Sequence, residues 1–172
     1  MEKEIINRVE RSGLIVIDLE EYKPDLEIAE FDIADYLWKR IILKEKEFRN
    51  ALNNINWSMY TQKTVAIFCS VDAIIPMWAY MLISIKLSEN GIKHGFGRPN
   101  DILRYEFLKK IESLDINQFK EAKVVIKGCS KKTIGEEVYI KLVERLYNVV
   151  DSIMFGEPCS TVPIWKKTKK KY

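Results

Sequence analysis

The sequence lacks the features that would assign the protein to a membrane, nucleotide-binding or repeat class. No apolar run approaches the ~20 residues that span a bilayer, and the opening residues MEKEIINRVERSG carry acidic residues where a signal peptide is basic. There is no complete dinucleotide fingerprint and no GKS or GKT phosphate loop. No repeat of about 20 to 50 residues is visible, so a solenoid is not expected. We therefore expect a cytoplasmic protein with no membrane partner.

Glycine and proline are scarce, with 7 and 5 residues among 172, and no low-complexity tract is present. With 47% hydrophobic and 31% charged residues, the composition is typical of a globular protein and not of a disordered or fibrous one. A chain of this length can bury a substantial core. We expect a single α/β domain over residues 1–165, followed by a lysine-rich disordered tail over residues 166–172.

The net charge of +3 is concentrated at the end of the chain. Five of the 28 basic residues are lysines within the last seven residues, KKTKKKY, so the preceding residues carry a net charge near −2. A lysine tail can add nonspecific affinity for phosphate backbones, but the rest of the chain has no recognisable basic recognition element. We therefore expect no nucleic-acid partner.

Short β-rich segments that alternate with helical patterns predict an α/β fold. Residues 14–19 and 28–33 are expected to form an N-terminal antiparallel strand pair, joined through the YKPD turn. Further strands are expected at 64–68, 92–96, 123–128 and 152–155, with helices between them. This alternation predicts a mainly parallel or mixed sheet with right-handed crossovers and helices on both faces.

Serine follows each of the three cysteines, Cys69, Cys129 and Cys159. Each cysteine comes just after the end of a predicted strand. In a parallel sheet the loops that follow the strands emerge at one edge, which is where open α/β folds bind ligands. We therefore predict that the three thiols converge on one site, although long segments separate them in the sequence. In the cytoplasm these thiols are expected to stay reduced.

Three thiolates could bind a metal centre. They could hold a [4Fe-4S] cluster with the fourth iron left open, or a zinc ion whose fourth ligand comes from Asp72, His94 or Glu157. The paired C-x-x-C segments of structural zinc sites are absent. We therefore favour an iron–sulfur cluster over zinc. Asp72 could instead be a helix N-cap.

The serines are candidates for a second layer around the thiolates. Ser70, Ser130 and Ser160 each offer a hydroxyl and a backbone N–H group, and a negatively charged sulfur is stabilised by such donors. Ser70 and Ser130 precede predicted helices, so they could cap those helices instead.

Two other interpretations of the cysteines remain open. The protein could be a metal-free thiol or persulfide protein, in which one thiol of low pKa accepts persulfide and another resolves it. It could also be a structural or interaction protein, because free cysteine is among the most buried residue types. The residues do not decide whether the protein is an enzyme.

Four segments of the chain resemble a known family: ILKEKEFRNAL (42–52), CSVDAIIPMWAYML (69–82), VVIKGCS (124–130) and SIMFGEPCSTVPI (152–164). They look like segments of DUF family 2480, an uncharacterised bacterial family associated with the Bacteroidetes lineage. The resemblance extends to about Ile164 and includes all three cysteines. The family has no assigned activity, but its members lie near genes for sulfur-mobilisation iron–sulfur assembly. The resemblance therefore implies iron–sulfur assembly proteins as partners.

Overall fold

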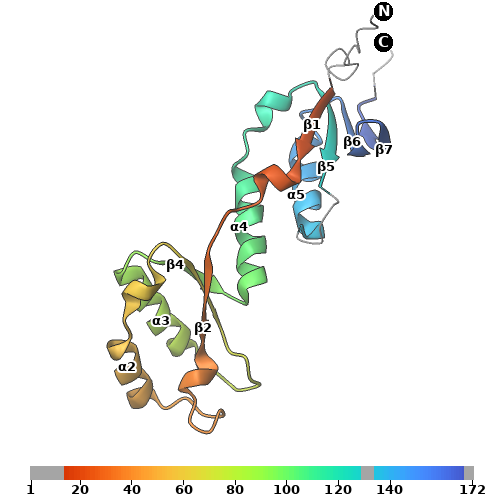
Figure 1. The fold of residues 1–172 in the computed structure, drawn as a ribbon. Coiled ribbons are helices and arrows are strands. Elements are labelled where there is room, and N and C mark those ends of the chain that lie inside the picture. The colour runs from red at the N-terminus through yellow and green to blue at the C-terminus, as the bar shows by residue number, and fades with distance from the viewer. Residues whose placement is uncertain (1–13, 129–133, 169–172) are drawn as a thin grey trace, which may run out of the picture. The chain divides into compact units, whose positions relative to one another are not determined.

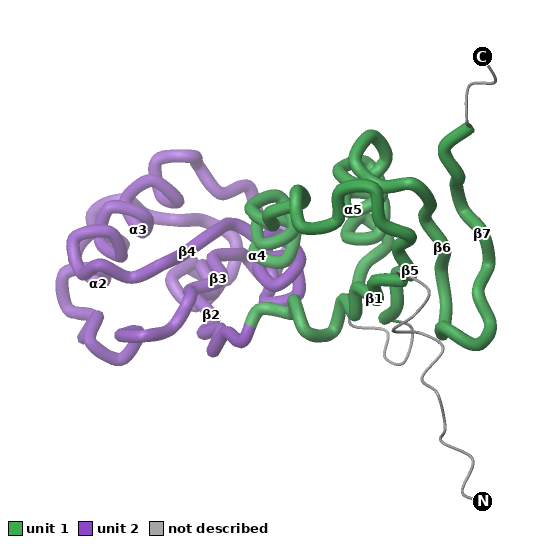
Figure 2. Tube along the Cα trace, turned by 90° about the horizontal axis from the view of Figure 1, so that it is seen from above, with its two compact units in different colours: residues 1–24, 106–172 green, residues 25–105 purple. Residues whose placement is uncertain are grey.

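The computed structural model describes residues 14–128 and 134–168, and the chain divides into two compact units (Figure 1, Figure 2). Unit 1 contains residues 1–24 and 106–172, and unit 2 contains residues 25–105. Each unit has its own sheet and its own hydrophobic core. Unit 2 is therefore a continuous segment inserted into the sequence of unit 1.

Unit 2 is built on a three-stranded parallel sheet in the order β2-β3-β4. The central strand, TVAIF, is buried along its whole length, as is typical of a strand covered on both faces. The elements are β2 (Ile28–Asp32), the 3-10 turn η2 (Ile33–Tyr36), α2 (Glu45–Asn54), the 3-10 turn η3 (Trp57–Tyr60), β3 (Thr64–Phe68), α3 (Met77–Glu89) and β4 (Lys93–Phe96).

Unit 1 has a four-stranded sheet in the order β1-β5-β6-β7, in which only β7 is antiparallel. The helix α4 begins in the sequence of unit 2 and ends in that of unit 1. The elements are β1 (Leu14–Asp18), the 3-10 turn η1 (Leu19–Tyr22), α4 (Pro99–Ser113), the 3-10 turn η4 (Ile116–Phe119), β5 (Lys123–Lys127), α5 (Glu136–Leu146), β6 (Ser152–Glu157) and β7 (Ser160–Lys166).

The predicted α/β class is confirmed, but the predicted N-terminal antiparallel pair is wrong. Strand β1 pairs in parallel with β5, and β2 pairs in parallel with β3, so the two segments lie in different sheets. The chain does not turn back after β1, because the Asp18 carboxylate accepts a hydrogen bond from the Glu20 N–H group and starts η1. The antiparallel pair is instead β6 with β7.

The single domain over residues 1–165 stays a prediction, as does the disordered tail. Lys166 is the last residue of β7, and residues 169–172 lie outside the described residues. In the described part of the chain, no helix has both the length and the apolar character needed to cross a membrane.

The two units repeat one order of elements. Unit 2 runs through strand, 3-10 turn, helix, 3-10 turn, strand, helix and strand, and unit 1 runs through the same series before adding β7. In each sheet the second strand of the series lies between the first and the third. The strand registers also agree, because Thr64 pairs with Lys93 and Lys123 pairs with Ser152, 59 positions later in both strands. No repeat of this length was expected from the sequence.

Unusual backbone angles recur at the same 59-residue spacing. Gly97 and Gly156 both have φ of 121°, and each follows the phenylalanine of an F-G-x-P segment. Gln62 and Glu121, between the second 3-10 turn and the following strand, have left-handed φ angles of 65° and 58°. Left-handed φ angles are uncommon outside glycine, so their recurrence supports a genuine structural repeat.

An aromatic contact recurs as well. Tyr80 lies edge-on to Phe96 with ring centroids 5.5 Å apart, and Tyr139 lies edge-on to Phe155 with centroids 5.9 Å apart. The angle between the ring planes is 81° in both pairs. Each pair joins the helix of a βαβ crossover to the strand that follows it.

The repeated glycines give the first testable prediction. A Cβ atom at Gly97 would lie 2.8 Å from Asp101 Cβ, and one at Gly156 would lie 2.7 Å from the Ser160 carbonyl oxygen. Gly97→Ala and Gly156→Ala are each expected to lower the free energy of unfolding by about 1–3 kcal/mol, measured by chemical denaturation. Gly91→Ala is the control, because φ there is 67° but no atom lies within 4 Å. An equal or larger loss for Gly91→Ala would contradict the steric account.

Candidate functional site

Asp32 joins two loops at the carboxyl edge of the unit 2 sheet. It ends β2 beside Phe68, which ends β3. Its Oδ1 atom accepts hydrogen bonds from the N–H group of Ala34 and from that of Ser70, both at 2.9 Å. One carboxylate therefore holds both the turn after β2 and the loop that contains Cys69 and Ser70.

The pKa of the Asp32 carboxyl is lower than its usual value. Partial burial acts to raise this pKa, but hydrogen bonds from Ser70 and Ala34 and the positive charge of Arg40 lower it further than burial raises it. The carboxylate is therefore ionised at neutral pH. Asp32 was not predicted as a site residue. A recognisable signal was present, because an aspartate ends a strand directly before a 3-10 turn both at Asp32 and at Asp18.

Cys69 lies directly after β3, as the sequence predicted. Its side chain is half-buried against the core of unit 2, and its Sγ atom donates to the carbonyl oxygen of Val71 at 3.4 Å. Burial raises the pKa of the Tyr80 hydroxyl, and the electrostatic effect of the nearby Cys69 adds to it. The Ser70 N–H group, predicted to support a thiolate, is bound to Asp32.

His94 is held away from Cys69. In the sheet it lies beside Val65, four positions before Cys69, which is about 13 Å along a strand. Its Nδ1 donates to the carbonyl oxygen of Ile92 at 2.9 Å, so its Nε2 accepts from the Ser84 hydroxyl at 2.7 Å when the ring is neutral. Asp72 is exposed in the loop that follows Cys69.

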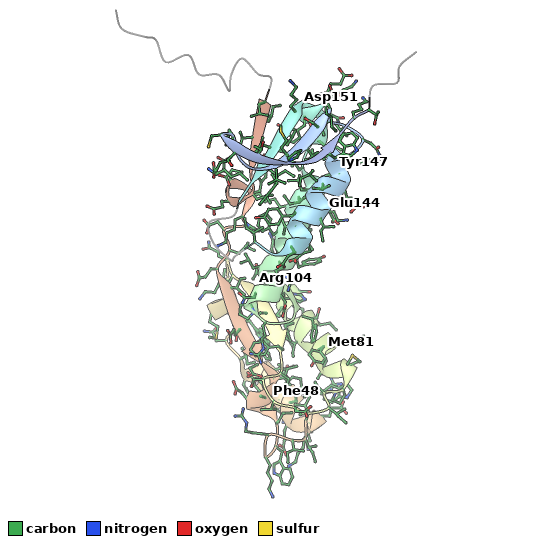
Figure 3. The ribbon with its side chains drawn as sticks, turned by 90° about the vertical axis from the view of Figure 1, so that its right-hand side faces the viewer. Phe48, Met81, Arg104, Glu144, Tyr147 and Asp151 are labelled. Carbon is green, nitrogen blue, oxygen red and sulfur yellow. The ribbon has the colours of Figure 1, made fainter. Side chains whose placement is uncertain are left out.

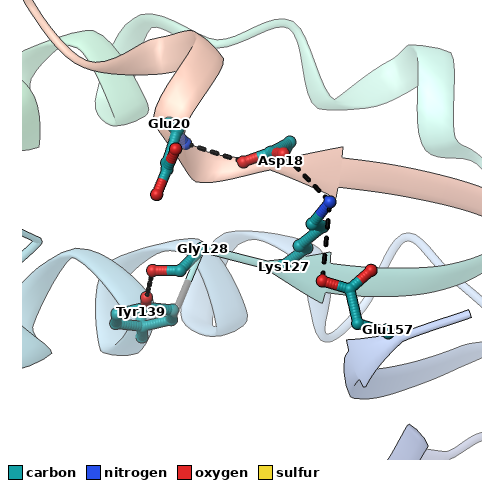
Figure 4. Close-up of polar contacts among 6 residues, drawn as sticks. All are labelled: Asp18, Glu20, Lys127, Gly128, Tyr139 and Glu157. Carbon is teal, nitrogen blue, oxygen red and sulfur yellow. Dashed lines mark hydrogen bonds and ion pairs between the residues drawn. The ribbon is translucent and has the colours of Figure 1, made fainter. Parts of the chain in front are cut away.

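At the carboxyl edge of the unit 1 sheet, ion pairs join the ends of three strands, β1, β5 and β6 (Figure 4). Lys127 at the end of β5 lies between Glu157 and Asp18, with its Nζ atom 3.5 Å from Glu157 Oε1 and 3.7 Å from Asp18 Oδ2. The charges of Glu157 and Asp18 raise the pKa of the Lys127 ammonium group. Glu157, a candidate ligand, is therefore paired with a cation in this structure.

Cys159 lies at the tip of a β-hairpin. Glu157 pairs with Ser160, so Pro158 and Cys159 form the two-residue turn between β6 and β7. The Cys159 side chain is exposed. The sequence correctly placed Cys159 after a strand, but it did not predict the return strand β7.

Cys129 and Ser130 lie outside the described residues. Among residues 14–128 and 134–168, no three histidine, cysteine, aspartate or glutamate side chains form a group that could hold a metal ion. Cys69 belongs to unit 2 and Cys159 to unit 1. The convergence of the three thiols therefore stays a prediction.

The repeat places two of the three cysteines one position apart and not at equivalent positions, because Cys69 is equivalent to Gly128 and Cys129 to Ser70. The sequence segments 69–76 and 128–135 are equal in length, because the strands before them and the helices after them are 59 residues apart. The Cys-Ser pair begins at the first position of one segment and at the second position of the other. Cys159 is equivalent to Asn100 and has no cysteine counterpart.

Comparison with known proteins identifies a family but no function. The family model described as "Protein of unknown function (DUF2480)" matches residues 3–167. No curated protein and no solved structure matches the chain. The match covers all three cysteines and confirms the resemblance seen in the sequence.

Asp32→Ala is expected to lower the free energy of unfolding by about 1–3 kcal/mol at pH 7, because two backbone N–H groups lose their acceptor. Since folding lowers the pKa of Asp32, its stabilisation is present above the unfolded pKa, near 3.9, and is lost as the pH falls through the folded pKa. The difference in the free energy of unfolding between the wild type and Asp32→Ala should therefore become smaller below about pH 4. Denaturation curves recorded from neutral to acid pH would measure it.

Asp35→Ala is the matched control, because Asp35 is an exposed aspartate in the adjoining turn η2. Its effect should stay within about 0.5 kcal/mol. A loss for Asp32→Ala that does not change with pH would contradict the assigned role of the carboxylate charge.

Proposed function

The chain belongs to the DUF2480 family, and because that family has no assigned function, we propose one from the chain's three cysteines and from the gene association that the family resemblance implies. Cys69, Cys129 and Cys159 bind an iron–sulfur cluster, with zinc as the alternative metal. The protein acts in the cytoplasm in an accessory role in iron–sulfur assembly, with assembly proteins as its partners.

The observation that carries the proposal is that neither described thiol lies among the fully buried core residues. Cys159 is exposed at a hairpin tip, and Cys69 is only partly covered at the end of β3. Cysteines retained for packing alone are expected among the most buried residues. The positions of these two thiols therefore weaken the interpretation that the cysteines are core residues.

The topology of unit 1 supports two ligands from one sheet edge. Strands β5 and β6 are parallel neighbours, and the side chains of Lys127 and Glu157 at their ends are 3.5 Å apart. Cys129 follows Lys127 by two residues, and Cys159 follows Glu157 by two residues. Consecutive Cα atoms are ~3.8 Å apart, so two residues of chain separate each cysteine in sequence from one of two neighbouring points on the edge.

The donor set fits a soft metal. Thiolate sulfur favours iron–sulfur clusters and zinc over magnesium or calcium. A bound iron–sulfur cluster would supply electron transfer, or would itself be passed to a recipient protein. Asp72 and Glu157 stay candidates for a fourth ligand, whereas the hydrogen bond from Ser84 occupies the Nε2 atom of neutral His94.

Anaerobic purification of the full chain, followed by iron and sulfide analysis and visible absorption, tests this function. The wild type should contain iron and acid-labile sulfide and absorb visible light, because three thiolates hold the cluster. Cys69→Ser, Cys129→Ser and Cys159→Ser should each lose most of the iron. Met59→Ser, which removes an exposed sulfur outside the proposed site, should retain it. A wild type that stays colourless and metal-free after reconstitution would refute the proposal.

A metal-free thiol or persulfide protein is the second candidate, and the exposure of Cys159 favours it. Alkylation rates measured by mass spectrometry separate the two functions. If the thiols share one cluster, all three should react slowly in the reconstituted protein and become reactive together when a chelator removes the metal. If one thiol acts alone, it should react much faster than the others at neutral pH, with or without metal.

A further inference from the structure

The segment between η2 and α2, LWKRIILK (37–44), forms a hairpin whose tip, residues 38–42, exposes large apolar side chains. Trp38, Ile41 and Ile42 are 45%, 63% and 52% exposed. Trp38 and Ile42 pair across the hairpin through two backbone hydrogen bonds of 2.8 and 3.2 Å. In Figure 1 this segment is the orange loop between β2 and α2. Three large apolar side chains within five residues therefore face solvent.

The core of unit 2 anchors both ends of the hairpin tip. Leu37 and Leu43, which flank the tip, are each 8% exposed and belong to the unit 2 core. Phe48, which Figure 3 labels on α2, is buried in the same core. The apolar residues of this segment thus divide into a buried pair and an exposed group. An exposed apolar cluster on an anchored loop is typical of an interaction site.

Positive charge lies beside the exposed apolar side chains. Lys39, Arg40 and Lys44 are exposed, and residues 37–44 include no acidic residue. The ammonium groups of Lys39 and Lys44 lie 4.5 and 5.0 Å from the centroid of the Trp38 ring. An ion pair with the adjoining α2 offsets only the charge of Lys44, which lies 3.0 Å from a Glu47 oxygen. The hairpin tip therefore combines apolar contact area with cations.

The turn at the tip holds two of these cations in an uncommon backbone conformation. Lys39 and Arg40 have left-handed φ angles of 51° and 58°, and the Ile41 N–H group donates to the Trp38 carbonyl oxygen at 3.1 Å. Turns with two left-handed residues favour Asn-Gly, which adopts these angles at little cost. Arg40 also acts electrostatically on Asp32. The backbone thus places a Lys-Arg pair at the tip, where strain is typical of binding loops.

We propose that the hairpin tip binds the surface of an anionic lipid bilayer. Trp38, Ile41 and Ile42 enter the boundary between headgroups and acyl chains, where tryptophan is enriched, and the cations contact anionic headgroups. The expectation of no membrane partner rested on the lack of a spanning segment, which a peripheral contact does not need. This binding goes beyond the proposed function and does not depend on the thiol site.

The side chains of the tip favour lipid over nucleic acid or a second copy. Single-stranded nucleic acid binds by stacking its bases on aromatic faces, but Lys39 and Lys44 already lie over the Trp38 ring. Ile41 and Ile42 offer a base no ring to stack on. Two copies of the tip would bring like charges together. A fluid anionic surface matches both the apolar group and the charges, and it needs no preformed groove.

Flotation of the full chain with lipid vesicles tests the proposal. The protein should bind phosphatidylcholine vesicles that contain phosphatidylglycerol, bind phosphatidylcholine alone much less, and dissociate at high salt. Ile41→Asp should lower the partition coefficient at least about tenfold, because it removes an inserted side chain and adds a repelled charge. Ile140→Asp is the matched control, because it makes the same charge change on α5 at a side chain 68% exposed, against 63% for Ile41.

The control also separates the tip from the terminal lysines of KKTKKKY, which can attract anionic vesicles by charge alone. Ile140→Asp should lower the partition coefficient by no more than about twofold, because the charge it adds lies away from the tip. Equal losses for Ile41→Asp and Ile140→Asp would overturn the proposal. So would a wild type that does not bind the anionic vesicles, whether the tip binds a single-stranded oligonucleotide or an acidic protein instead.

Quenching of tryptophan fluorescence by brominated lipid measures insertion directly and keeps the test decisive if Ile41→Asp perturbs folding. Trp38→Phe should still bind the vesicles, because phenylalanine is also apolar, but it should lose most of the lipid-dependent quenching. The other tryptophans are buried or half-buried, namely Trp57, Trp78 and Trp165. Quenching that is unchanged in Trp38→Phe would overturn the proposal.

Discussion

The parallel pairing of β1 with β5 is the constraint on which the rest of the structure depends. It joins Leu14–Asp18 to Lys123–Lys127 across roughly 100 residues and thereby brings together the two sequence segments that make up unit 1. The entropic cost of closing a loop grows only slowly with its length, so a whole folded unit can lie between two paired strands. The same pairing sets Asp18 beside Lys127, at the edge where Glu157 ends β6.

The two units share one order of backbone elements but carry different side chains at their sheet edges. At equivalent edge positions, unit 2 places the guanidinium of Arg98 over the ring of Phe68, whereas unit 1 has the ion pair of Glu157 with Lys127. Aspartates equivalent in position start the first 3-10 turn in both units. The repeated features therefore hold the fold, and the two units differ in their side-chain chemistry at the sheet edges and on the outer face of α3.

Local patterns predicted the elements well, because burial is visible in short segments such as TVAIF and KVVIK. They could not predict which strand β1 joins, since that choice depends on contacts made far along the chain. The repeat was hidden because unit 2 interrupts unit 1 and few identical residues, such as those of F-G-x-P, survive in both copies. The site was foreseen in part: Cys69 and Cys159 do follow strands, but the role of Asp32 depends on the β2–β3 pairing.

We propose that Cys69, Cys129 and Cys159 of this duplicated fold serve one metal centre. A crystal structure of the anaerobically purified protein tests it directly through the three distances between the Sγ atoms. Metal–sulfur bonds are about 2.3 Å long, so one cluster requires every pair of sulfur atoms to lie within about 8 Å. Distances in that range would support the account, and a sulfur pair clearly farther apart would contradict it.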